Sequence, residues 1–207
     1  MHRVVPFVAL DEIAADLDRT VTEWFGRARA TGRSEDRPAC RRGCAFCCHQ
    51  LVPLTVLEAQ RIGDYLSRLP RQERRQIGSS LDKHLNRFTA WVKNRPQGDV
   101  GDRAVNLDYL RQRIPCPFLG SENECRVYPV RPLLCRGHHA LETSARCQTA
   151  ETQIRTIPAV DTATQQAMRQ AQDLAVRLGL SSGGGLISSF VPLFRAAIGQ
   201  KEPSKKS

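Results

Sequence analysis

The sequence Cys40-Arg41-Arg42-Gly43-Cys44-Ala45-Phe46-Cys47-Cys48-His49 places four cysteines within nine residues. A soft metal ion prefers thiolate ligands, and four converging thiolates form a tetrahedral zinc site or hold an iron–sulfur cluster. Free cysteine is also a common core residue, but four thiols among arginines are hard to explain as part of an apolar core. We therefore interpret this block as a metal site around which the chain is organised.

The spacing within the block lets one loop surround a single centre. Three residues separate Cys40 from Cys44, and two separate Cys44 from Cys47. Gly43 permits the tight backbone that such a loop needs. Neighbouring side chains point in different directions, so Cys48 either serves a second centre, bridges two metal ions or is a buried thiol.

Four further cysteines follow the first block. They are Cys116, Cys125, Cys135 and Cys147. The first three lie on a turn-rich segment with little core of its own, which favours metal ligation, whereas Cys147 could be a ligand or a core residue. Eight cysteines suffice for two four-thiolate centres, or for one centre with redox-active thiols to spare. Histidines near the cysteines could replace one of them as ligand, and nearby arginines could lower the pKa values of the thiols or form plain surface charge. These histidines are His49, His138 and His139, and the arginines are Arg41, Arg42, Arg131 and Arg136.

Length and composition indicate one domain of residues 1–199, with its core motif at 40–147 and a disordered basic tail at 200–207. The 31 Lys and Arg residues exceed the 21 Asp and Glu residues by 10. No aromatic-studded basic stripe accompanies this charge, which argues against a nucleic-acid partner. No stretch reaches the roughly 20 apolar residues of a membrane span, and we recognise no signal peptide. We expect a reducing cytoplasm, where clustered cysteines favour metal chemistry over disulfides, and no membrane partner. A protein partner remains open.

The flanking sequence predicts helices. Apolar residues recur every three or four positions from about residue 8 to 30, which indicates an amphipathic helix. Thr55 and Glu58 form a capping box at the start of a helix reaching Leu69. Pro70 begins another helix, with an apolar face of Ile77, Leu81, Leu85, Phe88 and Val92. We expect these two helices to form an antiparallel hairpin that closes over the first cysteines.

Beyond residue 100 the pattern changes. A short helix is expected from Val105 to Arg113, followed by a small β-hairpin over residues 115–128 and a helical turn that carries Cys135. Asp161 is expected to cap a helix that runs to about Leu178, and residues 181–185 read as a flexible linker before a last short helix. The predicted fold is therefore mainly α, a helical domain with a small β-hairpin around a cysteine-rich metal centre.

Three motifs together resemble the YkgJ-type cysteine-cluster family, whose members are described as zinc- or iron-chelating domains. The first is the Cys40-to-Cys48 block, and the second is Cys116-Pro117-Phe118-Leu119. The third is Cys125-Arg126-Val127-Tyr128-Pro129-Val130-Arg131-Pro132-Leu133-Leu134-Cys135-Arg136. The resemblance covers residues 40–136 and implies metal or cluster binding, with Cys147 as the eighth cysteine by count.

Some larger proteins that resemble this family are flagellin lysine N-methylases. Cys40, Cys44 and Cys47, with Phe46 before the last of them, are also similar to the radical S-adenosylmethionine signature, in which three cysteines hold an iron–sulfur cluster. The helices expected after the motif do not match the alternating strands and helices of a partial barrel. Three roles therefore compete: a structural zinc module in an interaction protein, a redox or metal-handling protein, and a methyltransferase using a cluster and S-adenosylmethionine.

Overall fold

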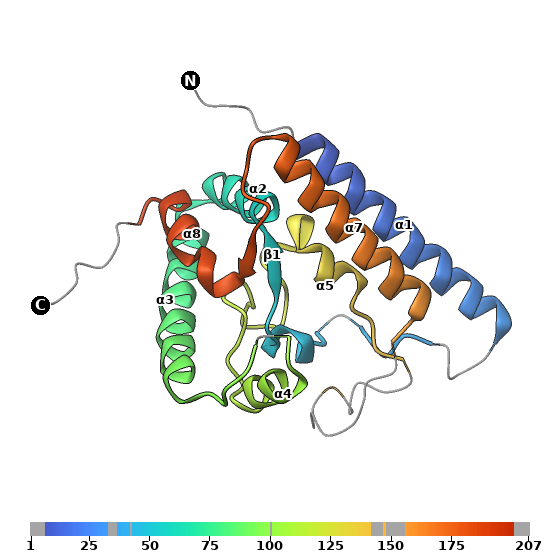
Figure 1. Ribbon diagram of the computed structural model, residues 1–207, viewed down its shortest axis with the longest axis horizontal. Coiled ribbons are helices and arrows are strands. Elements are labelled where there is room, and N and C mark those ends of the chain that lie inside the picture. Colours follow the sequence, from blue (N-terminus) through green and yellow to red (C-terminus); the bar gives the residue numbers. More distant parts are fainter. Residues whose placement is uncertain are drawn as a thin grey trace, which may run out of the picture.

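The computed structural model describes residues 7–32, 37–41, 43–99, 101–141, 147 and 156–200. Helices dominate, and one small two-stranded antiparallel sheet joins them, which confirms the predicted fold class (Figure 1). The elements in chain order are α1 (Phe7–Thr31), η2 (Phe46–His49), β1 (Pro53–Thr55), α2 (Val56–Ser67), α3 (Arg71–Asn94), α4 (Arg103–Arg111), η3 (Tyr128–Val130), α5 (Leu133–Gly137), α7 (Pro158–Arg177), β2 (Gly184–Leu186), η4 (Ile187–Phe190) and α8 (Val191–Ala197).

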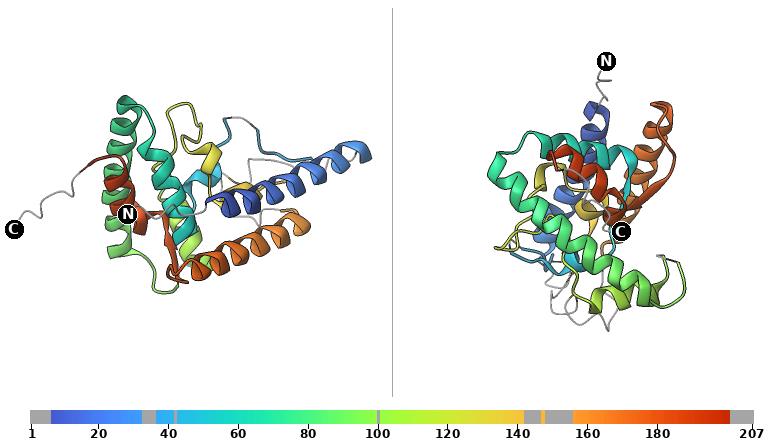
Figure 2. Two further views of the ribbon diagram at one scale, coloured as in Figure 1. Left: turned by 90° about the horizontal axis from the view of Figure 1, so that it is seen from above. Right: turned by 90° about the vertical axis from the view of Figure 1, so that its left-hand side faces the viewer.

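Helices α1 and α7 lie side by side and run in opposite directions (Figures 1 and 2). The buried face of α1 carries Leu10, Leu17 and Val21. Opposite it, α7 presents Ala167 and Ala171, whose small side chains let the two backbones approach closely. Helix α5 packs against both. This pair therefore forms one wall of the protein, and it holds the short helix that carries Cys135.

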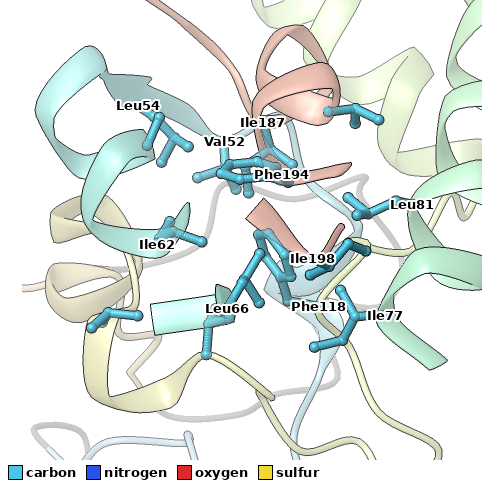
Figure 3. Close-up of a cluster of buried hydrophobic side chains, with 14 residues drawn as sticks. Val52, Leu54, Ile62, Leu66, Ile77, Leu81, Phe118, Ile187, Phe194 and Ile198 are labelled. Carbon is cyan, nitrogen blue, oxygen red and sulfur yellow. The ribbon is translucent and has the colours of Figure 1, made fainter. Parts of the chain in front are cut away.

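The main hydrophobic core lies among α2, α3 and α8 (Figure 3). The rings of Phe118 and Phe194 meet edge to face at its centre, with their centroids 5.2 Å apart. The predicted helices after Pro53 are confirmed as α2 and α3, and α8 packs against both of them. Partly buried Cys116, Cys125 and Cys135 pack against the same core, which fixes the second half of the cysteine motif in place.

The sheet lies elsewhere than the sequence suggested. Strand β1 pairs with β2 in the antiparallel register Pro53↔Leu186, Leu54↔Gly185 and Thr55↔Gly184. The prediction of a flexible linker over residues 181–185 is therefore wrong for Gly184 and Gly185, which belong to β2. A Cβ atom on Gly184 would lie 2.5 Å from the carbonyl oxygen of Leu54, so glycine here permits close backbone pairing rather than flexibility.

The predicted hairpin over residues 115–128 contains one isolated bridge, between Leu119 and Cys125. The Gly120 N–H donates to the Glu124 carbonyl at 2.8 Å and the Arg126 N–H donates to the Phe118 carbonyl at 2.9 Å, and these two bonds make up that single bridge. The segment is therefore a tight turn that presents Cys125.

Three smaller predictions also change. Helix α7 begins at Pro158 rather than at a cap on Asp161, whose carboxylate accepts the Thr156 hydroxyl at 2.5 Å. Val92, predicted to lie on the apolar face of α3, is 44% exposed. Its neighbour Trp91 is buried at that end of the helix instead. Residues 201–207 of the predicted tail lie outside the described residues. No helix in the described ranges is long and apolar enough to cross a membrane.

Candidate metal centre

The first cysteine block is held at both ends by the backbone. Upstream of Cys40, the Ala39 N–H donates to the Ala140 carbonyl at 2.8 Å. The Cys44 N–H then closes a turn on the Arg41 carbonyl at 2.9 Å, and Gly43 occupies the left-handed region at φ 84°. This confirms the tight turn predicted for Gly43. The short helix η2 follows and carries Cys47 and Cys48 side by side.

A backbone hydrogen bond joins Cys116, the first of the later cysteines, to the first cysteine block. The Cys116 N–H donates to the Cys48 carbonyl at 2.6 Å. Cys125 sits at the end of the tight turn, and its carbonyl accepts the Tyr128 N–H at 3.1 Å. Cys135 lies in α5, which begins after Pro132 as predicted. Two loops and helix α5 therefore carry these three cysteines, and the backbone of Cys116 binds directly to η2.

The eight thiols form two groups of three, with the neighbouring pair Cys47 and Cys48 between them. All eight are free; Cys147 is buried and the other seven are partly buried. We call Cys40, Cys44 and Cys147 the first thiol group, because Cys147 interacts electrostatically with both of the others. We call Cys116, Cys125 and Cys135 the second thiol group on the same grounds. Cys47 interacts with members of both groups and is hydrogen-bonded to Cys48. The adjacent pair Cys47 and Cys48 thus lies between the first and second thiol groups.

Burial favours the protonated form of six of these thiols in the absence of metal. Burial is the main cause that raises the pKa values of Cys40, Cys116, Cys125 and Cys135. The hydrogen bond with Cys48, followed by burial, raises the pKa of Cys47. Burial and the neighbouring thiols raise the pKa of Cys147 to about 11.

The expectation that arginines lower the thiol pKa values is therefore only partly right. Arg131 does lower the pKa values of Cys47, Cys125 and Cys135, and Arg136 lowers that of Cys125. Desolvation outweighs both arginines, because removing a thiolate from water costs more than a partly buried cation returns. Arg41 is exposed, and Arg42 lies outside the described residues.

Two of the three histidines considered as ligands have a ring nitrogen close to a backbone carbonyl oxygen. His49 Nδ1 lies 3.2 Å from the Ala45 carbonyl, and His139 Nε2 lies 2.9 Å from the Arg136 carbonyl. Among the described residues, His138 Nε2 is buried without a hydrogen-bond partner. Burial lowers the pKa values of all three, so their rings stay neutral.

This arrangement of thiols agrees with the comparison with known families. Residues 39–169 match the CxxCxxCC family, which is described as a "Putative zinc- or iron-chelating domain". The chain belongs to the CxxCxxCC family. The match starts one residue before Cys40 and extends past Cys147 into α7. It confirms the resemblance seen in the three sequence motifs. Neither the curated proteins nor the solved structures gave a match.

The donor set suits a metal of the kind that the CxxCxxCC description names. Across the described residues, no three His, Cys, Asp or Glu side chains already lie at the separations that one metal ion requires. The donors themselves are free thiols, of which seven are partly buried and Cys147 is buried. Zinc and iron–sulfur clusters both take such thiolates, and a low-polarity pocket strengthens the bonds that they form.

One residue that supports the site was missed in the sequence. His84 is 4% exposed; its Nδ1 lies 2.8 Å from the Pro115 carbonyl and its Nε2 lies 2.8 Å from the Ser188 hydroxyl. Because a carbonyl only accepts, Nδ1 carries the proton and Nε2 accepts from Ser188. His84 thereby ties α3 to η4 and to the residue before Cys116. Its position seven residues after buried Ile77, on the same helical face, is the signal that was available.

Proposed function

We propose that this chain binds metal in two adjacent four-thiolate centres. Cys47 completes the first thiol group and Cys48 completes the second. The observation that carries this proposal is that two separate sets of three free thiols both interact electrostatically with Cys47, which stands next to Cys48 in η2. The contact between Cys116 N–H and the Cys48 carbonyl supports the assignment of Cys48 to the second group. The division also explains why two cysteines stand next to each other, since one ion rarely takes both.

Zinc and an iron–sulfur cluster remain the two kinds of occupant for these centres. In either case the bound metal would link the 40–48 segment, the 116–135 loops and Cys147, which are far apart in the chain. Binding would draw the thiols together and release their protons, so that metal binding free energy becomes folding free energy. We infer a structural or redox role in a reducing cytoplasm, where the free thiols persist.

A cluster-dependent methyltransferase fits these observations less well. Such chemistry needs an iron with an open position for S-adenosylmethionine, whereas four thiolates per centre leave none open. The described residues that follow the first block form helices α2 and α3. A partial barrel would instead require alternating strands and helices.

Metal and acid-labile sulfide analysis of protein purified without oxygen tests the proposal. We expect about two metal ions per chain if zinc is bound, with four thiolates for each. Iron and sulfide in equal amounts, with a brown colour, would identify clusters instead. Protein that is colourless and free of metal, and that takes up neither Zn²⁺ nor reconstituted iron and sulfide, would refute the proposal.

Single substitutions then test the division into two centres. Cys44→Ser should abolish one centre and Cys125→Ser the other, each leaving about half of the metal. His49→Ala is the matched control, because His49 lies on the same short helix and should leave the metal content unchanged. If Cys44→Ser and Cys125→Ser each removed all the metal, one shared centre would replace the two proposed here.

A further inference from the structure

The side chain of Arg131 is held close to the second thiol group. It lies between Cys125 and Cys135 in the chain, and 19% of its side chain is exposed. Its guanidinium carbon lies 4.4 Å from the centroid of the Tyr128 ring, which supports one face of the group. It interacts electrostatically with Cys47, Cys125 and Cys135. Arg131 is thus a buried cation next to three of the proposed ligands.

Arg136, which lies nearby, provides a comparison because all three of its guanidinium nitrogens donate hydrogen bonds. Arg136 Nε donates to the Arg131 carbonyl at 3.0 Å, and Nη2 donates to the Pro129 carbonyl at 2.7 Å. Its Nη1 donates to the Asp18 carboxylate. Arg136 therefore fixes the backbone of the loop and ties it to α1.

In the part of the chain that the structure describes, Arg131 is less fully paired than Arg136, although it forms a long ion pair with Asp18. Among the described residues, its Nε is buried without a hydrogen-bond partner. Asp18 Oδ1 lies 3.8 Å from its Nη2, which is too far for a hydrogen bond, while the other oxygen of Asp18 accepts from Arg136 Nη1. A buried N–H of a charged group without an acceptor costs free energy. The position of Arg131 is therefore explained if a bound group supplies an acceptor for its Nε–H.

Metal-bound thiolates would supply that acceptor. Four thiolates on one divalent ion carry two excess negative charges, and burial makes that excess expensive. A nearby cation offsets the excess, and an N–H directed at sulfur stabilises the bound thiolate. Protein groups that hydrogen-bond to metal ligands tune both metal affinity and electronic properties.

We propose that Arg131 is the charge-compensating hydrogen-bond donor of the second centre, and that its Nε–H binds a metal-bound sulfur of Cys125 or Cys135. This inference rests on the proposed function, since it requires metal at that centre. Arg131 then acts through the ligands rather than as one of them, and it sets how tightly the second centre holds its metal.

Co²⁺ titration of reduced, metal-free full-length protein under anaerobic conditions tests this role. Competition with a chelator gives the affinity, and the sulfur-to-cobalt charge-transfer absorption reports on the sulfur electrons. We expect Arg131→Met to weaken Co²⁺ binding at one of the two centres by about 10- to 100-fold. We also expect its charge-transfer band to move to longer wavelength, because a sulfur without a hydrogen bond gives up electrons more easily. The control is Arg41→Met, which removes an exposed arginine next to Cys40 and should leave both readouts unchanged.

The outcomes separate this inference from the function on which it rests. Wild-type protein that shows no thiolate charge-transfer band with Co²⁺ would refute the proposed function itself. If wild-type protein binds Co²⁺, wild-type affinity in Arg131→Met would refute the role of Arg131. An affinity loss with an unmoved band would also refute it, because a purely structural effect would leave the band in place. If Arg131→Met fails to fold, Arg131→Lys decides, since it keeps the charge but lacks the guanidinium Nε–H; wild-type affinity and a wild-type band in that variant would refute the assignment to Nε–H.

Discussion

Replacing Glu58 by alanine should destabilise the protein strongly, because one carboxylate serves two helices. Its Oε2 accepts the Thr55 N–H and the Thr55 hydroxyl, both at 2.8 Å. Its Oε1 accepts the Leu133 N–H, also at 2.8 Å. Glu58 thus completes the capping box of α2 and also satisfies the first N–H of α5, the helix that carries Cys135.

The size of the effect follows from these contacts. Glu58→Ala leaves two buried backbone N–H groups without an acceptor, and each costs about 1–3 kcal/mol. Burial raises the pKa of Glu58, so the alanine variant also gains by relieving a desolvated carboxyl group. We expect a net loss of about 2–4 kcal/mol, which lowers the melting temperature by roughly 5–15 °C in a protein of this length.

Two milder variants make the prediction specific. Thr55→Ala removes the hydroxyl that accepts the Glu58 N–H at 3.2 Å, and should cost about 1 kcal/mol. Glu58→Gln keeps one acceptor oxygen but turns an NH₂ group toward an N–H, and should fall between the other two. Urea unfolding followed by circular dichroism gives the free energies of unfolding. If Glu58→Ala were no less stable than Thr55→Ala, the link from α2 to α5 would carry no free energy and the reasoning would fail.

Three further predictions concern the sheet, a buried histidine and the metal. Gly184→Val should destabilise by about 1–3 kcal/mol in urea, because its side chain would overlap the β1 backbone. Gly26→Ala, on the exposed face of α1 with no atom near the new Cβ, should stabilise by up to about 1 kcal/mol; equal effects would contradict the close pairing. Burial lowers the pKa of His84, so the unfolded chain takes up a proton at higher pH than the folded one. Its contribution to stability is therefore kept above about pH 6.5 and lost as the pH falls below it, and urea unfolding of His84→Gln should show a smaller loss between pH 7 and 5. A chelator should lower the melting temperature of the metal-loaded protein, and it should lower that of Cys147→Ser by less; an equal decrease would exclude Cys147 from the centres.

The sequence predicted those features of the structure that depend on residues close together in the chain. The capping box at Thr55 and Glu58, the tight turn at Gly43 and the helical phase of α1 each depend on residues within one or two turns. The cysteine motifs likewise identified the family, because ligand spacing is a local property of the loop that holds the metal.

Long-range partners could not be predicted in this way. Glu58 and Leu133 are 75 residues apart in the chain, and the sequence around each residue contains no pattern that predicts their hydrogen bond. The glycines around Gly184 have the composition of a linker, and only the position of Leu54 shows that they pair as a strand. The order of the cysteines also conceals that Cys147 joins Cys40 and Cys44 rather than the nearer Cys135.

The pairing of β1 with β2 has a consequence for how the protein is made. Strand β2, η4 and α8 complete the main core, and all of them follow the last cysteine in the chain. At translation rates of about 5–20 residues per second, the 40 residues from Cys147 to Ile187 take roughly 2–8 s to synthesise. All eight thiols are therefore translated before the segment that completes the core behind the second thiol group. During that interval the thiols lack their final packing and are more exposed than in the folded protein.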